Sequence, residues 1–215
     1  MSAAIFDMDG VLVDTSANHR AAWEALLDEL GLPARVDAWR CTIGRPAEEA
    51  VPLLLGRDVS DDEAWQLARR KRDLYLDLSQ RGTPAVAGVR AFVAELARQG
   101  VPRAVGTSAS HQDVGRLLAG AGLRQHFQVV VTAEDVTLGK PDPEVWILAA
   151  RRLRARAETC VVFEDSLVGI EAARRAGMRA IGVCTSYPAD ELRAAGADRA
   201  IDDFEGLEWS ALATA

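Results

Sequence analysis

The sequence has little of several features that mark other kinds of protein. Its three cysteines, Cys41, Cys160 and Cys184, are odd in number and widely separated, and they form no Cys-x-x-Cys pair. A zinc ribbon, a redox pair and a disulfide framework are therefore not indicated, and we expect a protein of the reducing cytoplasm. The N-terminus has no basic start before an apolar stretch, and no apolar run reaches membrane-spanning length. We therefore expect no membrane partner.

Basic charge is also scarce. The chain carries 25 Lys and Arg against 32 Asp and Glu, a net charge of −7. Its one basic cluster, Arg69 to Arg72, lies inside an amphipathic helical pattern and is typical of a solvated face. We therefore expect no nucleic-acid partner. The 215 residues, 49% of them apolar, suffice for one large domain or for a domain with a substantial insertion, and we expect a monomer.

The second half of the chain alternates between helical and strand patterns. Apolar strands are expected at 103–106, 128–131, 160–163 and 180–183, and helices at 88–99, 110–121, 143–154 and 169–176. The N-terminal stretch 3–6 has the composition of a further strand, and 200–215 that of a last short strand and helix. Such alternation is typical of an α/β fold with a doubly wound parallel sheet covered by helices on both faces.

Residues 15–82 have a different pattern. Apolar residues recur at helical spacing from Ala22 to Leu30, and the sequence from Ser60 to Glu63 is that of a capping box before a long helix to Leu78. We find no convincing strand in this segment. The sequence therefore predicts a small all-helical cap domain (15–82) inserted into an α/β core formed by 1–14 and 83–215, with hinges near 14–16 and 82–87.

Two close carboxylates, Asp7 and Asp9, follow the first expected strand, and Gly10 ends it. Ligands of open α/β sheets bind at the carboxyl ends of the strands. Two adjacent carboxylates repel each other and need a cation or a shared proton. The pair suits Mg²⁺ together with one carboxylate as nucleophile and the other as proton carrier. An acidic turn facing water is the alternative for this motif alone.

Further polar residues follow other expected strands. Thr107 and Ser108 precede a helix, where hydroxyls and free N–H groups suit a phosphate, although an ordinary helix cap has the same composition. Lys140 could neutralise phosphoryl charge, although an isolated lysine is usually a surface group. Glu164 and Asp165 follow a strand that should be central. Buried acids need a partner, and a divalent cation is a natural one.

Taken in order, these motifs resemble those of a known family. Asp7-Met8-Asp9-Gly10, Thr107, Lys140-Pro141 and Glu164-Asp165 are similar to the four signature motifs of the haloacid dehalogenase superfamily of phosphoryl-transfer enzymes. The resemblance covers essentially the whole chain. An aspartate at position 9 favours the phosphatase and phosphomutase branch, and the helical insertion resembles the β-phosphoglucomutase-like subgroup.

The resemblance implies a role for each motif. Asp7 would be the nucleophile that forms an aspartyl phosphate, and Asp9 the general acid and then the general base. The phosphoryl group would be held by Thr107, Ser108 and Lys140. Mg²⁺ would be bound by Asp7, the backbone carbonyl of Asp9, Glu164 and Asp165.

Residues of the helical insertion bear on whether the phosphoryl group passes to water, as in a phosphatase, or to a second sugar oxygen, as in a mutase. His19 and Lys71 resemble cap residues of β-phosphoglucomutase, although a half-buried helix residue and a solvated lysine explain them equally well. The arginine that holds a second phosphate in that mutase is replaced by Ala47, with Arg45 as the nearest substitute.

The Lys-Asn pair of that mutase is also absent, because Ser110-His111-Gln112 stands in its place. The prediction is therefore a Mg²⁺-dependent phosphatase of a small phosphorylated metabolite, with a sugar phosphate favoured. A sugar phosphomutase is the alternative, and a receiver-like phospho-switch is a third.

Overall fold

A six-stranded parallel sheet forms the centre of the protein. The computed structural model describes residues 2–33, 38–79 and 82–213. The strands are β1 (Ala3–Phe6), β2 (Arg103–Gly106), β3 (Val129–Val131), β4 (Cys160–Glu164), β5 (Arg179–Val183) and β6 (Arg199–Ile201). They lie in the order β3-β2-β1-β4-β5-β6, and every neighbouring pair is parallel. This confirms the predicted α/β fold with a parallel sheet.

The strand order indicates where a ligand site is expected. The chain proceeds outward from β1 through β2 to β3 on one side, and from β4 through β5 to β6 on the other, so the winding reverses between β1 and β4. In such sheets the ligand crevice lies at the carboxyl ends of the strands where the order reverses. Phe6 pairs with both Val105 and Phe163, so β1, β2 and β4 end at the same level of the sheet.

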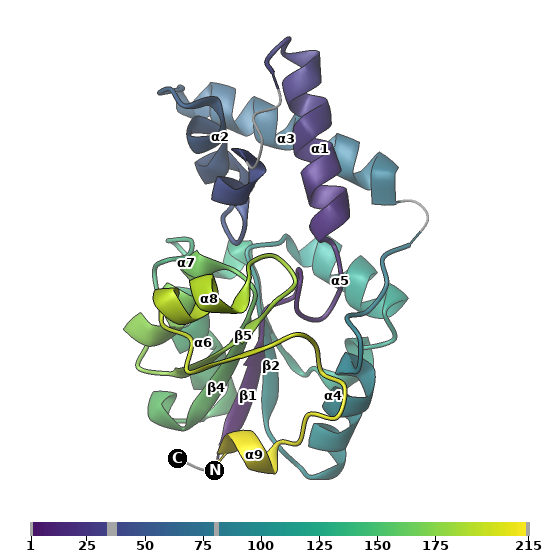
Figure 1. The fold of residues 1–215 in the computed structure, drawn as a ribbon, viewed down its shortest axis with the longest axis vertical. Helices are drawn as coiled ribbons and strands as arrows, with labels where there is room; N and C mark the ends of the chain where they lie inside the picture. Colours follow the sequence, from purple (N-terminus) through teal and green to yellow (C-terminus); the bar gives the residue numbers. More distant parts are fainter. Residues whose placement is uncertain (1, 34–37, 80–81, 214–215) are drawn as a thin grey trace.

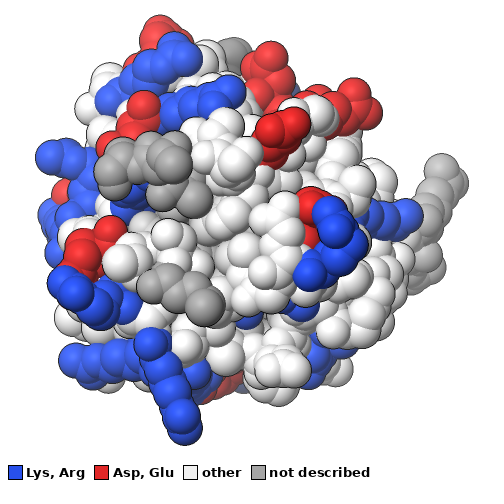
Figure 2. Space-filling view, turned by 90° about the horizontal axis from the view of Figure 1, so that it is seen from below, with Lys and Arg blue, Asp and Glu red and all other residues white. Residues whose placement is uncertain are grey.

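Helices cover both faces of the sheet (Figure 1). One face carries α4 (Val89–Arg98) and α5 (His111–Gly120), and the other carries α6 (Glu144–Leu153), α7 (Leu167–Arg175) and α8 (Ala189–Ala195). The short α9 (Ser210–Ala213) follows β6 at the lower end of the molecule. Figure 2 shows that lower end, where basic and acidic side chains surround a largely uncharged middle.

Alternation along β1 explains why both faces are covered. Ala4 and Phe6 point into the apolar core beneath α4 and α5, whereas Ala3 and Ile5 point into the core beneath α6 to α8. All four side chains are fully buried, as expected for a central strand of a two-faced parallel sheet.

The helices and strands that the structure describes between β1 and α4 are all helices. It contains α1 (Ser16–Glu29), the 3₁₀ helix η1 (Ala38–Thr42), α2 (Ala47–Leu55) and α3 (Asp61–Leu78). In Figure 1 this insertion lies above the carboxyl ends of the strands. It has an apolar cluster of its own, formed by Trp23, Leu26, Leu27, Ala50, Val51 and Leu54. No helix in the described part of the chain is long and apolar enough to cross a membrane.

The two connections to the insertion lie side by side. The backbone N–H of Asp14 donates to the carbonyl of Pro84 (2.8 Å), and that of Val86 donates to Leu12 (3.3 Å). These are the segments that the sequence predicted as hinges. The two chain connections between the sheet and the insertion therefore lie at one place, directly after the carboxylate pair.

The capping box predicted for α3 forms only in part. The Ser60 side chain accepts a hydrogen bond from the backbone N–H of Glu63 (3.2 Å), as expected. The Glu63 carboxylate, however, accepts hydrogen bonds from the Arg57 guanidinium, which draws it away from the return bond of a capping box. A charged partner outcompetes a backbone amide because charge-assisted hydrogen bonds are stronger.

We expect the aromatic core around Phe6 to dominate the stability of the sheet. Phe6 stacks on Phe163 with ring centroids 4.7 Å apart and also contacts Phe92, Phe127 and Phe204. Phe6→Ala should lower the free energy of unfolding by about 3–5 kcal/mol, because a buried ring is replaced by a cavity.

Urea denaturation measures this change. Leu53→Ala is the control, because Leu53 is 50% exposed and its truncation should cost less than about 0.5 kcal/mol. Equal effects of the two substitutions would contradict the packing described here.

Candidate active site

A buried lysine lies between two buried carboxylates at the carboxyl end of the sheet. Asp7 follows β1, Glu164 is the last residue of β4, and Lys140 lies in the loop before α6. The Lys140 Nζ atom is 2.7 Å from Asp7 Oδ1 and 2.7 Å from Glu164 Oε2. All three side chains are buried. Three of the residues predicted for the site are therefore in direct contact.

Asp165, directly after β4, adds a third buried carboxylate. Asp7, Glu164 and Asp165 each place a carboxylate oxygen within 4.8 Å of the others. Burial raises the pKa of Asp7 and of Asp165, and the neighbouring carboxylates raise both further, while Lys140 opposes the shift at Asp7. Burial alone would lower the pKa of Lys140, but Asp7 and Glu164 outweigh it and raise that pKa. One lysine thus faces three carboxylates, and an all-oxygen donor set with surplus negative charge fits a hard divalent cation.

Two glycines make room for these carboxylates. A Cβ atom on Gly10 would lie 2.0 Å from Asp165 Oδ2, and Gly10 has a φ of +75°. A Cβ on Gly169 would lie 2.0 Å from Glu164 Oε2. Side chains at these two positions would displace the acids, which explains physically why a glycine follows each acidic motif.

Sequence reasoning missed two residues that hold Asp165. The Ser186 hydroxyl donates to Asp165 Oδ2. The neighbouring Thr185 hydroxyl donates to the Gly10 carbonyl at 2.6 Å and lies 3.4 Å from the same Asp165 oxygen. Thr185 and Ser186 follow β5 shortly after it ends, so the signal that marked the other motifs was present here also.

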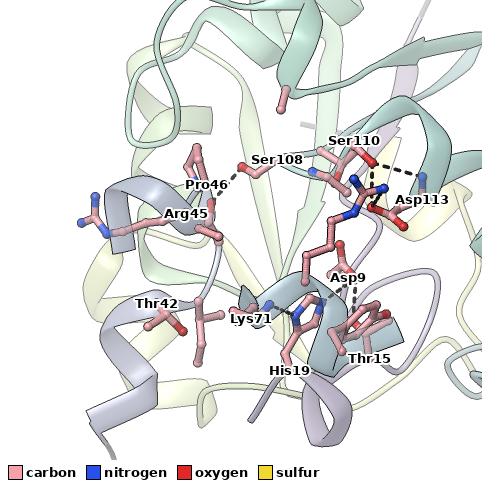
Figure 3. Close-up of a pocket in the computed structure, with 18 of the residues that line it drawn as sticks. Asp9, Thr15, His19, Thr42, Arg45, Pro46, Lys71, Ser108, Ser110 and Asp113 are labelled. Carbon is pink, nitrogen blue, oxygen red and sulfur yellow. Dashed lines mark hydrogen bonds and ion pairs between the residues drawn. The ribbon is translucent and has the colours of Figure 1, made fainter. Parts of the chain in front are cut away.

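Asp9 is held by residues of the insertion and of its connection (Figure 3). The Thr15 hydroxyl donates to Asp9 Oδ1 at 2.7 Å, and His19 Nε2 lies 3.3 Å from the same oxygen. Lys71 Nζ lies 2.7 Å from His19 Nδ1. Because an ammonium group can only donate, His19 accepts at Nδ1 and donates from Nε2 to Asp9.

The electrostatics of this chain keep Asp9 ionised. Burial raises the pKa of Asp9, but the hydrogen bonds from His19 and Thr15 and the charge of Lys71 outweigh burial and lower it. Burial lowers the pKa of Lys71 to about 8. Burial and the charge of Lys71 also lower the pKa of His19. Asp9 is therefore ionised in the free site and can accept a proton. Its hydrogen-bond partners, Thr15 and His19, differ from those of Asp7 and Glu164, which bond Lys140.

These groups open into one cavity of about 540 Å³ between the insertion and the sheet. Asp7, Asp9, Lys140 and Asp165 lie on its sheet side, together with Thr107. Thr107 is buried, and its hydroxyl accepts a hydrogen bond from the backbone N–H of Ala109 (3.1 Å).

Ser108 and the insertion residues that were predicted to contact substrate occupy different parts of the cavity wall. The Ser108 hydroxyl donates to the Gly44 carbonyl at 3.0 Å and so joins the sheet to the insertion. His19 and Lys71 line the cavity beside Asp9, whereas the Arg45 guanidinium points away from Asp9 (Figure 3). Arg45 is therefore at the wall of the cavity but is not gathered with the other predicted residues.

Comparison with known proteins assigns the family. A family model described as haloacid dehalogenase-like hydrolase matches residues 1–177. Fructose-1-phosphate phosphatase YqaB of Escherichia coli K12 is 37% identical over 183 residues, which cover 83% of this chain and 94% of that protein. The beta-phosphoglucomutase of Bacillus subtilis 168 is 29% identical over 195 residues, which cover 87% and 85%.

The fold comparison agrees. The crystal structure of a hydrolase from Pseudomonas syringae is similar over the whole of both chains, with a TM-score of 0.92 and 27% identity. The chain therefore belongs to the haloacid dehalogenase-like hydrolases, as the four motifs indicated. The receiver-like alternative is left without support.

The buried charge of Lys71 should cost stability. Its pKa in the folded protein is about 8, below the usual 10.5, so only the unfolded chain stays protonated between these values. Wild-type stability should therefore rise with pH across that window, and the cost of burial is fully present below pH 8. Lys71→Met should raise the free energy of unfolding at pH 7 by about 2 kcal/mol, with an advantage that fades toward pH 10.

Denaturation at several pH values measures this effect. Arg69→Met, an exposed position on the same helix, should show no such pH dependence. A Lys71→Met variant that is less stable than wild type at pH 7 would contradict the account.

Proposed function

We propose that the protein is a Mg²⁺-dependent phosphatase that hydrolyses a small phosphorylated metabolite, with a sugar phosphate favoured, through an aspartyl-phosphate intermediate. The observation that carries the proposal is the buried Asp7–Lys140–Glu164 contact beneath a cavity that Asp9 also lines. A nucleophile and a separate acid–base group are thus both exposed to one space. A monomeric, cytoplasmic enzyme remains a prediction from the sequence.

Asp7 is the proposed nucleophile. Its bond to Lys140 keeps one carboxylate oxygen fixed and brings positive charge to the place where phosphoryl oxygens gather charge. Asp7, Asp165 and the backbone carbonyl of Asp9 would hold Mg²⁺, which when bound offsets phosphoryl charge.

Glu164, the fourth predicted ligand, lies in the same acidic cluster. Its carboxylate already accepts hydrogen bonds from Lys140 and from the backbone N–H groups of Asp165 and Ser166. We therefore assign it mainly to holding the lysine, with its charge adding to the pull on a cation.

Asp9 is the proposed acid–base group. Asp9 is ionised in the free site, so it must gain a proton when the phosphate ester binds, and the negative charge of the ester favours this. In the first step Asp9 gives that proton to the leaving oxygen of the ester. In the second step it takes a proton from the water that attacks the phosphoryl group on Asp7, which restores its protonated form. The bonds from Thr15 and His19 hold its carboxylate at the cavity. Thr107, the backbone of Ser108 and Lys140 would hold the phosphoryl oxygens between the two aspartates.

Residues 15–82 would then act as a cap domain on a core of 1–14 and 83–215. The insertion lies over the strand ends and contributes His19 and Lys71 to the cavity wall. Closure of such a cap over bound substrate excludes bulk water and completes the set of catalytic groups.

Hydrolysis is favoured over phosphoryl return to the sugar. A mutase needs cations for a second phosphate, yet Ala47 and Ser110 line the cavity at the positions in question, and His111 and Gln112 are exposed. The likeness to a fructose-1-phosphate phosphatase points the same way. The mutase alternative draws its support from His19 and Lys71.

Phosphorus NMR distinguishes the two outcomes. The protein is incubated with Mg²⁺, glucose 1-phosphate and a trace of glucose 1,6-bisphosphate, and then with fructose 1-phosphate. Growth of the inorganic phosphate signal supports the phosphatase. Growth of glucose 6-phosphate with little free phosphate would overturn it in favour of the mutase.

Asp7→Asn should abolish turnover while leaving the fold intact. The substitution keeps the shape of the side chain but removes the nucleophilic carboxylate, so we expect a loss of roughly a thousandfold or more in kcat. Asp14→Asn is the matched control, because Asp14 is exposed nearby and should keep wild-type activity. Phosphate release with a colorimetric assay measures both variants. An Asp7→Asn enzyme that keeps most of its activity would remove Asp7 from the role of nucleophile.

A further inference from the structure

A short segment of the insertion, from Gly44 to Pro46, contacts two loops of the core. At its start, the Gly44 carbonyl accepts a hydrogen bond from the Ser108 hydroxyl at 3.0 Å. At its end, the buried Pro46 precedes α2 and lies against Gly139, the residue directly before Lys140. Figure 3 shows Ser108 and Pro46 next to each other at the cavity. The segment therefore bridges the loop after β2 and the loop that carries the lysine.

The contact at Gly139 leaves no room for a side chain. A Cβ atom at this position would lie 2.8 Å from Pro46 Cγ and 2.9 Å from Pro46 Cδ. Such distances are well inside van der Waals contact, so one of the two segments would have to move. Gly139 does not have a positive φ, so its own backbone conformation would accept an alanine. The insertion, and not the backbone conformation of the loop, is therefore what excludes a methyl group here.

Pro46 cannot easily move out of the way. Its ring is rigid, and its φ of −55° is close to the value that the ring imposes. The Pro46 carbonyl accepts the first hydrogen bond of α2, from the backbone N–H of Ala50 at 3.1 Å. Ala50 and Val51 in turn belong to the apolar cluster of the insertion. A displacement of Pro46 would therefore move α2 against its own core.

The loop that carries the lysine is held from two sides. The backbone N–H groups of Thr137 and Leu138 donate to Glu144 Oε2 on α6, at 2.7 and 3.0 Å. The next N–H group, that of Gly139, donates to the Glu49 carboxylate of α2. A Cβ on Gly139 would also lie 2.9 Å from Glu49 Oε1. The core thus supplies the acceptor for the first two N–H groups, and the insertion supplies the acceptor for the third.

The position of this loop matters because Lys140 has little freedom. Its Nζ atom lies 2.7 Å from Asp7 Oδ1 and 2.7 Å from Glu164 Oε2. A shift of the preceding residue by a few tenths of an ångström would be passed to these bonds, since Lys140 is fully enclosed. Misplacement of a catalytic group by about 1 Å can cost on the order of a hundredfold in rate.

We propose that Pro46 is a positioning residue whose ring, packed on Gly139, couples the placement of the insertion to the placement of Lys140. The insertion then does more than cover the cavity, because it is one of the two supports of the loop that carries the lysine. This inference rests on the proposed phosphatase function, in which Lys140 offsets the charge that develops on the phosphoryl oxygens.

Gly139→Ala and Pro46→Ala, alone and together, test the coupling. Gly139→Ala adds one methyl group that the Pro46 ring blocks, so kcat for fructose 1-phosphate should fall about 10–100-fold, with a smaller change in KM. Adding Pro46→Ala removes the blocking Cγ and Cδ atoms, and the flexible Glu49 side chain can rotate away. The double variant should therefore return to within about threefold of Pro46→Ala alone.

Gly115→Ala is the matched control. Gly115 is exposed on α5, and an added Cβ would meet nothing within 4 Å, so this variant should keep wild-type activity. Additive losses in the double variant would show that the methyl group disturbs the loop without Pro46, and would overturn the proposal. Wild-type activity of Gly139→Ala would overturn it also.

Hydrogen exchange without substrate, followed by mass spectrometry, separates this inference from the proposed function. Gly139→Ala should speed exchange severalfold in the peptide that contains residues 137–140, and adding Pro46→Ala should slow it again. Peptides from α4 should not change. Unchanged exchange in Gly139→Ala would overturn the coupling, whether or not the wild type hydrolyses an ester. The expected exchange pattern without any hydrolysis by the wild type would instead count against the phosphatase.

Discussion

The contact of Lys140 with Asp7 and Glu164 is the interaction on which the rest of the site depends. Two bonds of 2.7 Å in a buried place join the loop before α6 to the ends of β1 and β4. Removing Lys140 would leave buried carboxylates without their cation, which is far more costly than losing a surface ion pair. The lysine still leaves the cluster with more negative than positive charge, because Asp165 is buried beside it. This excess of carboxylates over cationic groups favours the binding of a divalent cation at the site.

The fold meets this constraint through register and close packing. The parallel pairing that aligns Phe6 with Phe163 brings Asp7 level with Glu164, at the point where the winding of the sheet reverses. Gly10 and Gly169 let the backbone approach within a distance that any Cβ would block. Asp9 lies two residues beyond Asp7 and is held from the other side, by Thr15 and by the His19–Lys71 pair. The two aspartates therefore have opposite electrostatic surroundings, which suits two different chemical roles.

Much of this arrangement could be predicted from the sequence, because residues just beyond the ends of parallel strands meet at one edge. That rule located Asp7, Thr107, Lys140, Glu164 and Asp165 without coordinates. It could not show that the Glu164 carboxylate is occupied by Lys140, because hydrogen-bond partners depend on side-chain geometry. The Ser186 contact with Asp165 was missed although Ser186 also lies just beyond a strand, because the short polar sequence there is equally typical of an ordinary turn. The buried indole N–H of Trp39, which has no partner among the described residues, likewise leaves no pattern in the sequence, because hydrogen-bond pairing depends on packing. The same holds for Arg45, whose direction away from Asp9 only the structure gives.

Mass spectrometry of rapidly acid-quenched enzyme is the decisive test of whether Asp7 carries the phosphoryl group during turnover. The protein is mixed with Mg²⁺ and an excess of a hydrolysable ester, quenched within the first turnover, digested under acid conditions and mapped. We expect the added mass of one phosphoryl group on the peptide that contains Asp7, with fragmentation placing it on that residue and not on Asp9. Phosphate release in the first turnover with no labelled peptide, or with the label on another residue, would contradict it.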